Sequence, residues 1–323
     1  YLPTIGVTAS ASSAIGWKNS ADHLTSNCAL YILAYFPVSQ SMSNDLRQGA
    51  ILLLSGELML SIMAALIKYL SQDVSHEMLV FTRNLFGLLF LLPLISHHGL
   101  RSLKTTRFGA HLMRSVVGVA AMYGYFYVIT HLPLAEAALV KLSSPFFLPL
   151  IALLWLGERI NLRTMWAIVI GFVGVVFVLR PGAETFQPVA LVGVGAAALA
   201  SLAKVTIRHM ADTEPGHRIV FYFGILATLV SAVPLLWGWT SPGLSTLPWL
   251  AAIGLTGTLG QLLMTKAYQV AKPGQVGPFT YTAVLYAALF GWMFWDEVVI
   301  ITTLIGSALI ISAGILNMKS SQK

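Results

Sequence analysis

The sequence predicts an all-α membrane protein in which ten transmembrane helices form two inverted repeats of five helices. Three observations lead to this fold class. The chain of 323 residues is 57% hydrophobic and 10% charged, and a soluble domain of this length needs more polar surface. Apolar stretches long enough to cross about 30 Å of hydrocarbon follow one another, with short polar loops between them. The interval from Pro133 to Glu158 is matched, within one residue, by the interval from Pro273 to Glu297.

The first part of the chain, residues 1–46, differs in composition from the rest. It is rich in Ser, Ala, Thr and Asn, and its short apolar run ends at Pro37. We therefore expect a disordered or spurious extension, with Met42 as a candidate start of the membrane protein. Cys28 is the single cysteine, which excludes an intramolecular disulfide and a thiolate metal cluster. We predict no cofactor and no metal.

Ten apolar spans follow, and several of the loops between them carry a proline or a glycine. The first five spans make up repeat one, residues 47–182, and the last five make up repeat two, residues 188–318. No loop is long enough to hold a soluble domain. We place the spans near residues 48–70, 77–96, 108–130, 134–156, 162–179, 189–210, 218–238, 247–269, 275–295 and 299–317.

Basic residues gather in the loops on one side of this predicted bundle. The other side carries only Lys68 and Arg180, beside several acidic residues. Since cytoplasmic loops carry an excess of Lys and Arg, we expect both termini in the cytoplasm and the protein in the inner membrane. The same placement explains the net charge of +7 without nucleic acid as a partner. The basic residues of the first side are Arg101, Lys104, Arg107, Arg159, Arg163, Arg208, Arg218, Lys272, Lys319 and Lys323.

The odd number of helices in each repeat bears on function. The second copy must enter the bilayer upside down, and two such halves can rock about a site at the midplane, as in secondary transporters. A membrane enzyme acting on lipid is the alternative from another class, but the eight histidines are scattered and no HExxH or GxSxG motif occurs. A scaffold or sensor would leave the charges inside the spans without a role.

Short motifs between residues 112 and 182 carry a family resemblance. They are Arg114-Ser115, Phe126-Tyr127, Leu132-Pro133-Leu134-Ala135, Ser144-Pro145, Leu156-Gly157-Glu158-Arg159, Gly171-Phe172-Val173-Gly174-Val175 and Arg180-Pro181-Gly182. As a set they resemble the first repeat of the EamA-like family of the drug/metabolite transporter (DMT) superfamily, with a weaker counterpart in the second repeat. The resemblance implies ten transmembrane helices and ATP-independent transport of small metabolites, commonly export. Val284 and Asp296 depart from it, at positions where proline and glycine are usual.

The resemblance also implies structural roles. Spans 1, 3, 4, 6, 8 and 9 then line the cavity, and spans 5 and 10 lie at the periphery. Gly171 and Gly174 are expected in helix packing or in a homodimer contact through spans 5 and 10, with a monomer as the alternative. The other residues expected in structural roles are Arg114, Pro145, Glu158 and Glu297.

Glu57 and Lys141 are the main candidates for the site. Glu57 lies roughly 13 Å inside the first span and Lys141 roughly 12 Å inside the fourth, from opposite faces. A charge at such depth costs about 2.5–3.5 kcal/mol, so each needs a partner, water or substrate. We predict that both point into one cavity, either as a couple switched by proton or substrate or as a static ion pair.

Four further residues are candidates for substrate contacts. Arg83 suits a carboxylate or phosphate, and Ser144 lies beside the helix-breaking Pro145. The rings of Tyr123 and Tyr281 are suited to stacking on a planar substrate, with membrane-interface aromatics as the alternative. Lys204, like Lys266, is expected to reach the cytoplasmic interface, and Glu136 is expected to snorkel or to cap its helix. The predicted function is proton-coupled export of small amino-acid-like or other organic solutes, with import by the same fold as the alternative.

Overall fold

The structure is a computed structural model that describes residues 44–96, 104–157, 160–179, 188–210, 213–271 and 276–320. All described residues belong to one compact unit, Ser43–Lys323. The extension predicted for residues 1–46 therefore lies outside the described residues, apart from its last three residues, which are helical.

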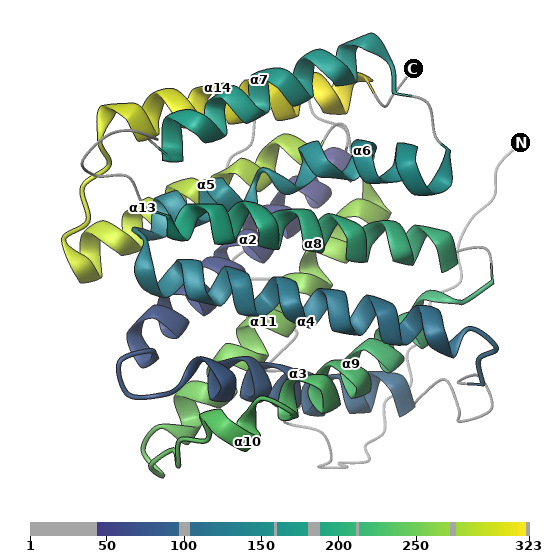
Figure 1. The fold of residues 1–323 in the computed structure, drawn as a ribbon, viewed down its shortest axis with the longest axis vertical. Helices are drawn as coiled ribbons and strands as arrows, with labels where there is room; N and C mark the ends of the chain where they lie inside the picture. The colour runs from purple at the N-terminus through teal and green to yellow at the C-terminus, as the bar shows by residue number, and fades with distance from the viewer. Residues whose placement is uncertain are drawn as a thin grey trace, which may run out of the picture. The chain divides into compact units, whose positions relative to one another are not determined.

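Every regular element in the described part of the chain is a helix (Figure 1). The helices are α2 (Asn44–Leu70), α3 (His76–Ser96), α4 (Phe108–His131), α5 (Leu134–Lys141), α6 (Ser144–Leu156), α7 (Leu162–Leu179), α8 (Val189–Met210), α9 (Gly216–Ala232), α10 (Leu235–Gly238), α11 (Leu247–Val270), the 3-10 helix η2 (Gly277–Tyr281), α13 (Thr282–Trp295) and α14 (Ile301–Ser320).

Several of these helices have the length and composition of membrane spans. Five stretches are long and apolar enough to cross a bilayer, and three shorter apolar helices accompany them. The long stretches are Asp45–Leu70, Phe108–His131, Leu134–Trp155, Val189–Ile207 and Leu247–Tyr268, and the shorter ones are Leu162–Val178, Arg218–Ala232 and Ile301–Leu316.

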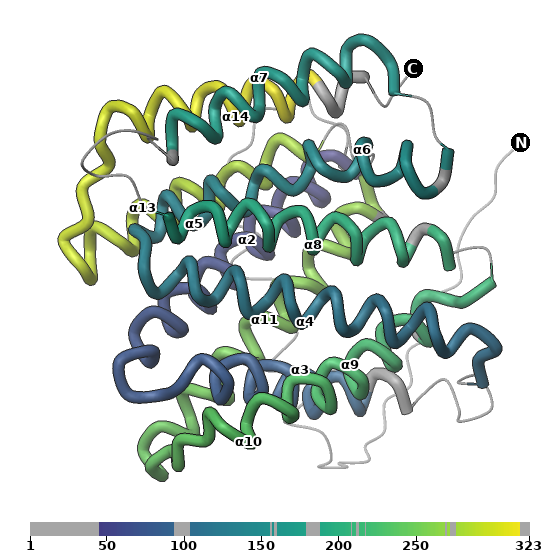
Figure 2. The backbone as a smooth tube through the Cα atoms, viewed as in Figure 1, coloured from purple at the N-terminus to yellow at the C-terminus, as the bar shows by residue number. Residues whose placement is uncertain are grey.

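Helices of the first half pack mainly against helices of the second half. The helix α2 packs along α11, and α4 packs along α8. In the same way α3 packs on both α9 and α11, and α9 packs on both α3 and α4. The helices α7 and α14, far apart in sequence, lie side by side at one edge of the bundle (Figure 2). The set of contacting helix pairs is unchanged when each helix is replaced by its counterpart in the other repeat. The counterparts are α2 and α8, α3 and α9, α4 and α11, and α7 and α14.

Glycines allow the closest of these contacts. A Cβ on Gly56 of α2 would lie 3.1 Å from the carbonyl oxygen of Gly260 in α11. Likewise a Cβ on Gly306 of α14 would lie 2.8 Å from the carbonyl oxygen of Gly174 in α7. Helix backbones approach this closely only where side chains are absent. Gly174 and Gly306 therefore form a close helix–helix contact within one chain.

The predicted fourth and ninth spans are both interrupted. In the first repeat, α5 ends at Lys141 and α6 begins at Ser144, with Pro145 in the first turn of α6. Proline suits this first turn because its missing N–H would have no helical partner there. In the second repeat the 3-10 helix η2 precedes α13 and carries Pro278 in its first turn. Position 284, where the family pattern has proline, is Val284 and lies within α13.

Candidate functional site

A small cavity lies among α2, α4, α5 and α13. Its polar lining consists of Glu57, Ser61, Tyr125 and Lys141, and alanines, leucines and Ile129 supply the rest. Since α2, α4 and α5 come from the first repeat and α13 from the second, the cavity is shared between the repeats. Its volume is about 20 Å³, which suits a water-sized group.

Glu57 reaches this cavity from the middle of α2. Glu57 and Ser61 are one helical turn apart and share a face, so both side chains point to the same side. The glutamate is 3% exposed, and its Oε2 atom has no hydrogen-bond partner in the described structure. A buried carboxylate oxygen without a partner is costly, and such atoms gather at functional sites.

Lys141 enters the cavity at the last residue of α5. Its Nζ lies 5.5 Å from the centre of the Tyr125 ring, a distance at which cation and ring attract. The carbonyl groups at a helix C-terminus also favour a cation. Lys141 and Glu57 both line the cavity and their charges interact, yet no direct ion pair joins them within the described residues.

Ser144 lies three residues beyond Lys141, at the start of α6. Its hydroxyl is 2.8 Å from the hydroxyl of Ser201 in α8, and Ser201 in turn donates to the Ser144 carbonyl oxygen at 2.7 Å. Lys204 of α8 donates from Nζ to the Ser144 hydroxyl at 3.1 Å. Lys204 is thus bonded to the α5–α6 break, a role that its sequence position near a helix end did not suggest.

Arg83 and Tyr123 lie apart from the cavity lining, in a polar layer between α3, α4 and α9. Arg83 is buried and donates to the side-chain oxygen of Asn84 at 3.2 Å. Asn84 donates to Ser231 Oγ at 3.3 Å, and the Tyr123 hydroxyl donates to the Ser231 carbonyl oxygen at 3.4 Å. The layer joins helices from both repeats.

Several predicted residues make packing contacts in the structure. The Tyr281 ring is buried, and its hydroxyl fills the space that a Cβ on Gly314 would need. Gly171 leaves the same kind of space for the Phe146 ring. The Arg114 guanidinium lies 4.0 Å from the centre of the Phe223 ring. Glu158 lies outside the described residues.

Glu297 joins the two repeats at the end where α2 finishes. Its carboxylate forms an ion pair with Lys68 and accepts a hydrogen bond from the backbone N–H of Leu134 at 2.7 Å. Lys68 also donates to the carbonyl oxygen of Leu132 at 2.8 Å. Nearby, Glu136 is buried and accepts a hydrogen bond from Thr303 at 3.1 Å. We refer to the first contact as the Lys68–Glu297 pair.

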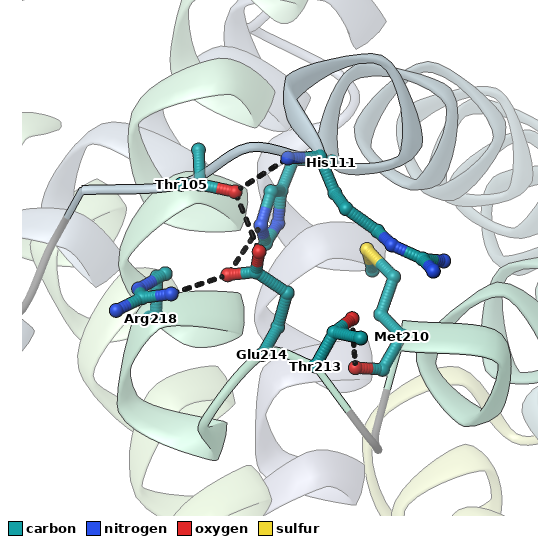
Figure 3. Close-up of polar contacts among 7 residues, drawn as sticks. Thr105, His111, Met210, Thr213, Glu214 and Arg218 are labelled. Carbon is teal, nitrogen blue, oxygen red and sulfur yellow. Dashed lines mark hydrogen bonds and ion pairs between the residues drawn. The ribbon is translucent and has the colours of Figure 1, made fainter.

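A second ionic group lies at the opposite end of α4, and we term Thr105, His111, Glu214 and Arg218 the Glu214 cluster (Figure 3). The Glu214 carboxylate accepts hydrogen bonds from Thr105 at 2.7 Å and Arg218 at 3.0 Å, and it lies 3.4 Å from His111 Nε2. Burial alone would raise the pKa of Glu214, but the contacts with Thr105, Arg218 and His111 lower it below its ordinary value.

The comparison with known proteins decides the family. A family model of EamA-like transporters matches residues 47–180 and 187–318. The chain belongs to the EamA-like transporter family. It is 33% identical over 271 residues to the pseudopaline exporter of Pseudomonas aeruginosa, covering 83% of this chain and 95% of that protein.

Other relatives of this EamA-like protein are named as transporters too. It is 28% identical to the S-adenosylmethionine uptake transporter of Rickettsia bellii, over 79% of this chain and 88% of the relative. It is 29% identical to the riboflavin transporter of Brucella anthropi, over 76% of this chain and 89% of the relative. A solved crystal structure shares its fold, with a TM-score of 0.59 and 20% identity over 85% of this chain and 97% of that one.

The predicted family is therefore confirmed, and with it the general class of function. This EamA-like protein is a multi-pass membrane protein of the DMT superfamily that transports small metabolites and is not an enzyme. The alternative of a membrane enzyme acting on lipid is set aside, because the relatives of this chain are named as transporters.

Proposed function

We propose that the protein exports small amino-acid-like metabolites across the inner membrane by alternating access, with proton coupling through Glu57. In this proposal ten spans form two inverted repeats and both termini lie in the cytoplasm. The cavity that holds Glu57 and Lys141 is the substrate site, and the repeats rock about it. Other small organic solutes remain within the proposed substrate range.

The observation that carries this proposal is the shared cavity of Glu57 and Lys141. It is bordered by helices of both repeats, as a midplane site between two rocking halves must be. Its volume of about 20 Å³ is too small for a metabolite. Substrate entry therefore requires the bordering helices to separate, which is the motion that alternating access supplies.

The two charges give a physical route to coupling. A protonated Glu57 is neutral and leaves Lys141 available to a substrate carboxylate, whereas an ionised Glu57 competes for the same ammonium group. Protonation and substrate binding are then linked, because each changes the free energy of the other. A static Glu57–Lys141 arrangement that only fixes helix packing is the competing interpretation.

Export is the favoured direction because the relative at 33% identity is named an exporter. Import is the alternative, supported by the relatives named as S-adenosylmethionine uptake transporters. The same fold serves both, since direction depends on the gradient that drives the cycle and not on the helix arrangement.

Flux measurements in proteoliposomes test the proposal. Amino acids, vitamins and nucleobases are screened for uptake and efflux at several values of internal and external pH. For any transported solute, Glu57→Gln should remove the dependence of flux on pH, because the titrating carboxylate is gone. The matched control is Asp73→Asn, which removes an exposed carboxylate from the loop after α2.

The outcomes separate coupling from transport itself. A Glu57→Gln protein with the wild-type pH profile would refute proton coupling through Glu57. A wild type that moves none of the solutes in either direction would refute amino-acid-like transport. A profile altered equally by Asp73→Asn would point to general surface charge and not to the cavity.

A further inference from the structure

The break between α5 and α6 brings several polar groups to one place. Lys141 is the last residue of α5, and Ser144 is the first residue of α6. The start of α6 carries a partial positive charge, although its Phe146 N–H already donates to the Ser143 carbonyl oxygen at 2.9 Å. Interrupted transmembrane helices recur in transporters, where such half-helix ends meet charged parts of the substrate.

Lys204 adds a second ammonium group to this place. Its Nζ donates to the Ser144 hydroxyl, and this is its one hydrogen bond within the described residues. An ammonium group has three N–H donors, so two of the Lys204 donors remain for water or a ligand. Lys204 also interacts electrostatically with both Lys141 and Glu57.

The exposure of Lys204 shows that these donors can be reached. Seven-residue spacing puts Lys204 and Ala197 on nearly the same face of α8. Ala197 is 4% exposed, and Gly193 on that face lies against Val140 of α5, so the face points into the bundle. Lys204 itself is exposed. An exposed lysine on an inward face can be reached by water or a ligand between the helices.

The charges around this break define what it can bind. Lys141 and Lys204 contribute two positive charges and a protonated Glu57 contributes none, so an anionic group is favoured near the lysines. Glu57 Oε2 has no hydrogen-bond partner in the described structure, and it suits a cationic donor. A ligand with both an anionic and a cationic group would satisfy all three.

We propose that Lys204 and Ser144 form, with Lys141, a subsite for a substrate carboxylate at the α5–α6 break, while the protonated Glu57 accepts a hydrogen bond from the substrate's cationic amine. The inference rests on the proposed function, and it narrows the substrate class to molecules that carry a carboxylate beside an amine. The Ser201 hydroxyl fixes Ser144 at 2.8 Å and so orients the subsite.

Binding to the purified full chain in detergent tests this subsite. The probes are L-amino acids and their α-amides, which differ only in the carboxylate, and the readout is the thermal stabilisation that each produces. At least one amino acid should stabilise the wild type more than its amide does. Lys204→Met should raise the half-saturating concentration of that acid about 10-fold, the loss of one charge-assisted hydrogen bond, and leave the amide unchanged.

Three further variants complete the test. Lys204→Arg should keep the preference for the acid, because it keeps the charge. Lys266→Met is the matched control, since Lys266 is also exposed and lies on α11, and it should behave as the wild type. If Lys204→Met fails to fold, Ser144→Ala takes its place and should weaken the acid more than the amide.

The outcomes that overturn the inference are distinct from those that overturn the proposed function. Equal binding of acids and amides by the wild type, or identical acid binding by Lys204→Met and Lys266→Met, would overturn the carboxylate subsite while flux of other solutes persists. Acid-selective binding that Lys204→Met weakens, without flux in proteoliposomes, would support the subsite and overturn transport of that ligand.

Discussion

At the residue scale, the two repeats end the predicted fourth and ninth spans in the same left-handed backbone conformation. Gly157 follows α6 with a φ of 69°, and Asp296 follows α13 with a φ of 52°. Glycine adopts this left-handed conformation without cost, whereas a residue with a Cβ is strained there. Asp296 also puts a negative charge at the negative end of its helix.

Asp296→Gly should therefore stabilise the protein by about 0.5–1 kcal/mol, which corresponds to a rise in Tm of about 2 °C. The gain is limited because glycine also loses more chain entropy on folding. Thermal unfolding in detergent, followed by tryptophan fluorescence, measures the change. The matched control is Gly157→Ala, which should lower Tm by a similar amount, and an unchanged Tm for Asp296→Gly would contradict the strain argument.

Single residues also show how far sequence reasoning extends. The depth of Glu57 and Lys141 in their apolar spans selects them as candidates, because a charge in hydrocarbon requires a partner, and both line one cavity in the structure. Lys204 was assigned to the interface because it lies near a helix end. Its partner Ser144 is distant in sequence, and no periodicity within α8 specifies which helix packs against that face.

At the element scale, the Lys68–Glu297 pair links the end of α2, the turn before α5 and the segment between α13 and α14. Both side chains are 14% exposed; Lys68 also donates to the Leu132 carbonyl oxygen, and Glu297 also accepts from the Leu134 N–H. Removing one partner of such a pair leaves a nearly buried charge without compensation, which costs more than removing both.

Lys68→Met should accordingly destabilise the protein by about 3 kcal/mol. The double variant Lys68→Met/Glu297→Gln should be more stable than Lys68→Met alone, because the uncompensated carboxylate is gone while a side-chain oxygen still faces the Leu134 N–H. Thermal unfolding of the single and double variants measures the difference. Additive losses would contradict the ion-pair argument and indicate independent packing roles.

The interrupted helices show which helix breaks can be predicted from the local sequence. Pro145 predicts the break before α6, since proline removes a backbone donor and clashes with the preceding turn. The 3-10 helix η2 lacks such a clear prediction, because the family pattern places a proline at position 284, inside α13, whereas the proline of η2 is Pro278. A break is thus predictable from a proline, but its register depends on the packing around it.

At the scale of the whole molecule, the matched outlines of the two repeats predicted a duplicated chain, and the family match covers both copies. The all-helical fold followed from composition and apolar length alone. The pairing of α2 with α11 and of α4 with α8 did not, because every span presents a similar apolar surface to its neighbours. Small residues such as Gly56 and Gly260 decide which helices approach closely.

The Glu214 cluster joins the two repeats at the end of α4 opposite the Lys68–Glu297 pair, and it makes the stability of the whole molecule depend on pH. The pKa of Glu214 is lowered from its ordinary value of 4.5 by the contacts with Thr105, Arg218 and His111, against the opposing effect of burial. An acid with a lowered pKa in the folded state stabilises the fold at pH values above 4.5, and this contribution is lost as the pH falls through the lowered value.

Glu214→Gln lacks this contribution at every pH, so the difference in Tm between wild type and variant should be largest near neutral pH. The difference should shrink as the pH falls below 4.5, where the wild type loses the same charge. Thermal unfolding in detergent between neutral pH and pH values below 4.5 measures it, with Asp73→Asn as a matched control for an exposed carboxylate. A difference that stays constant with pH would show that Glu214 stabilises the junction of the repeats through shape and not through charge.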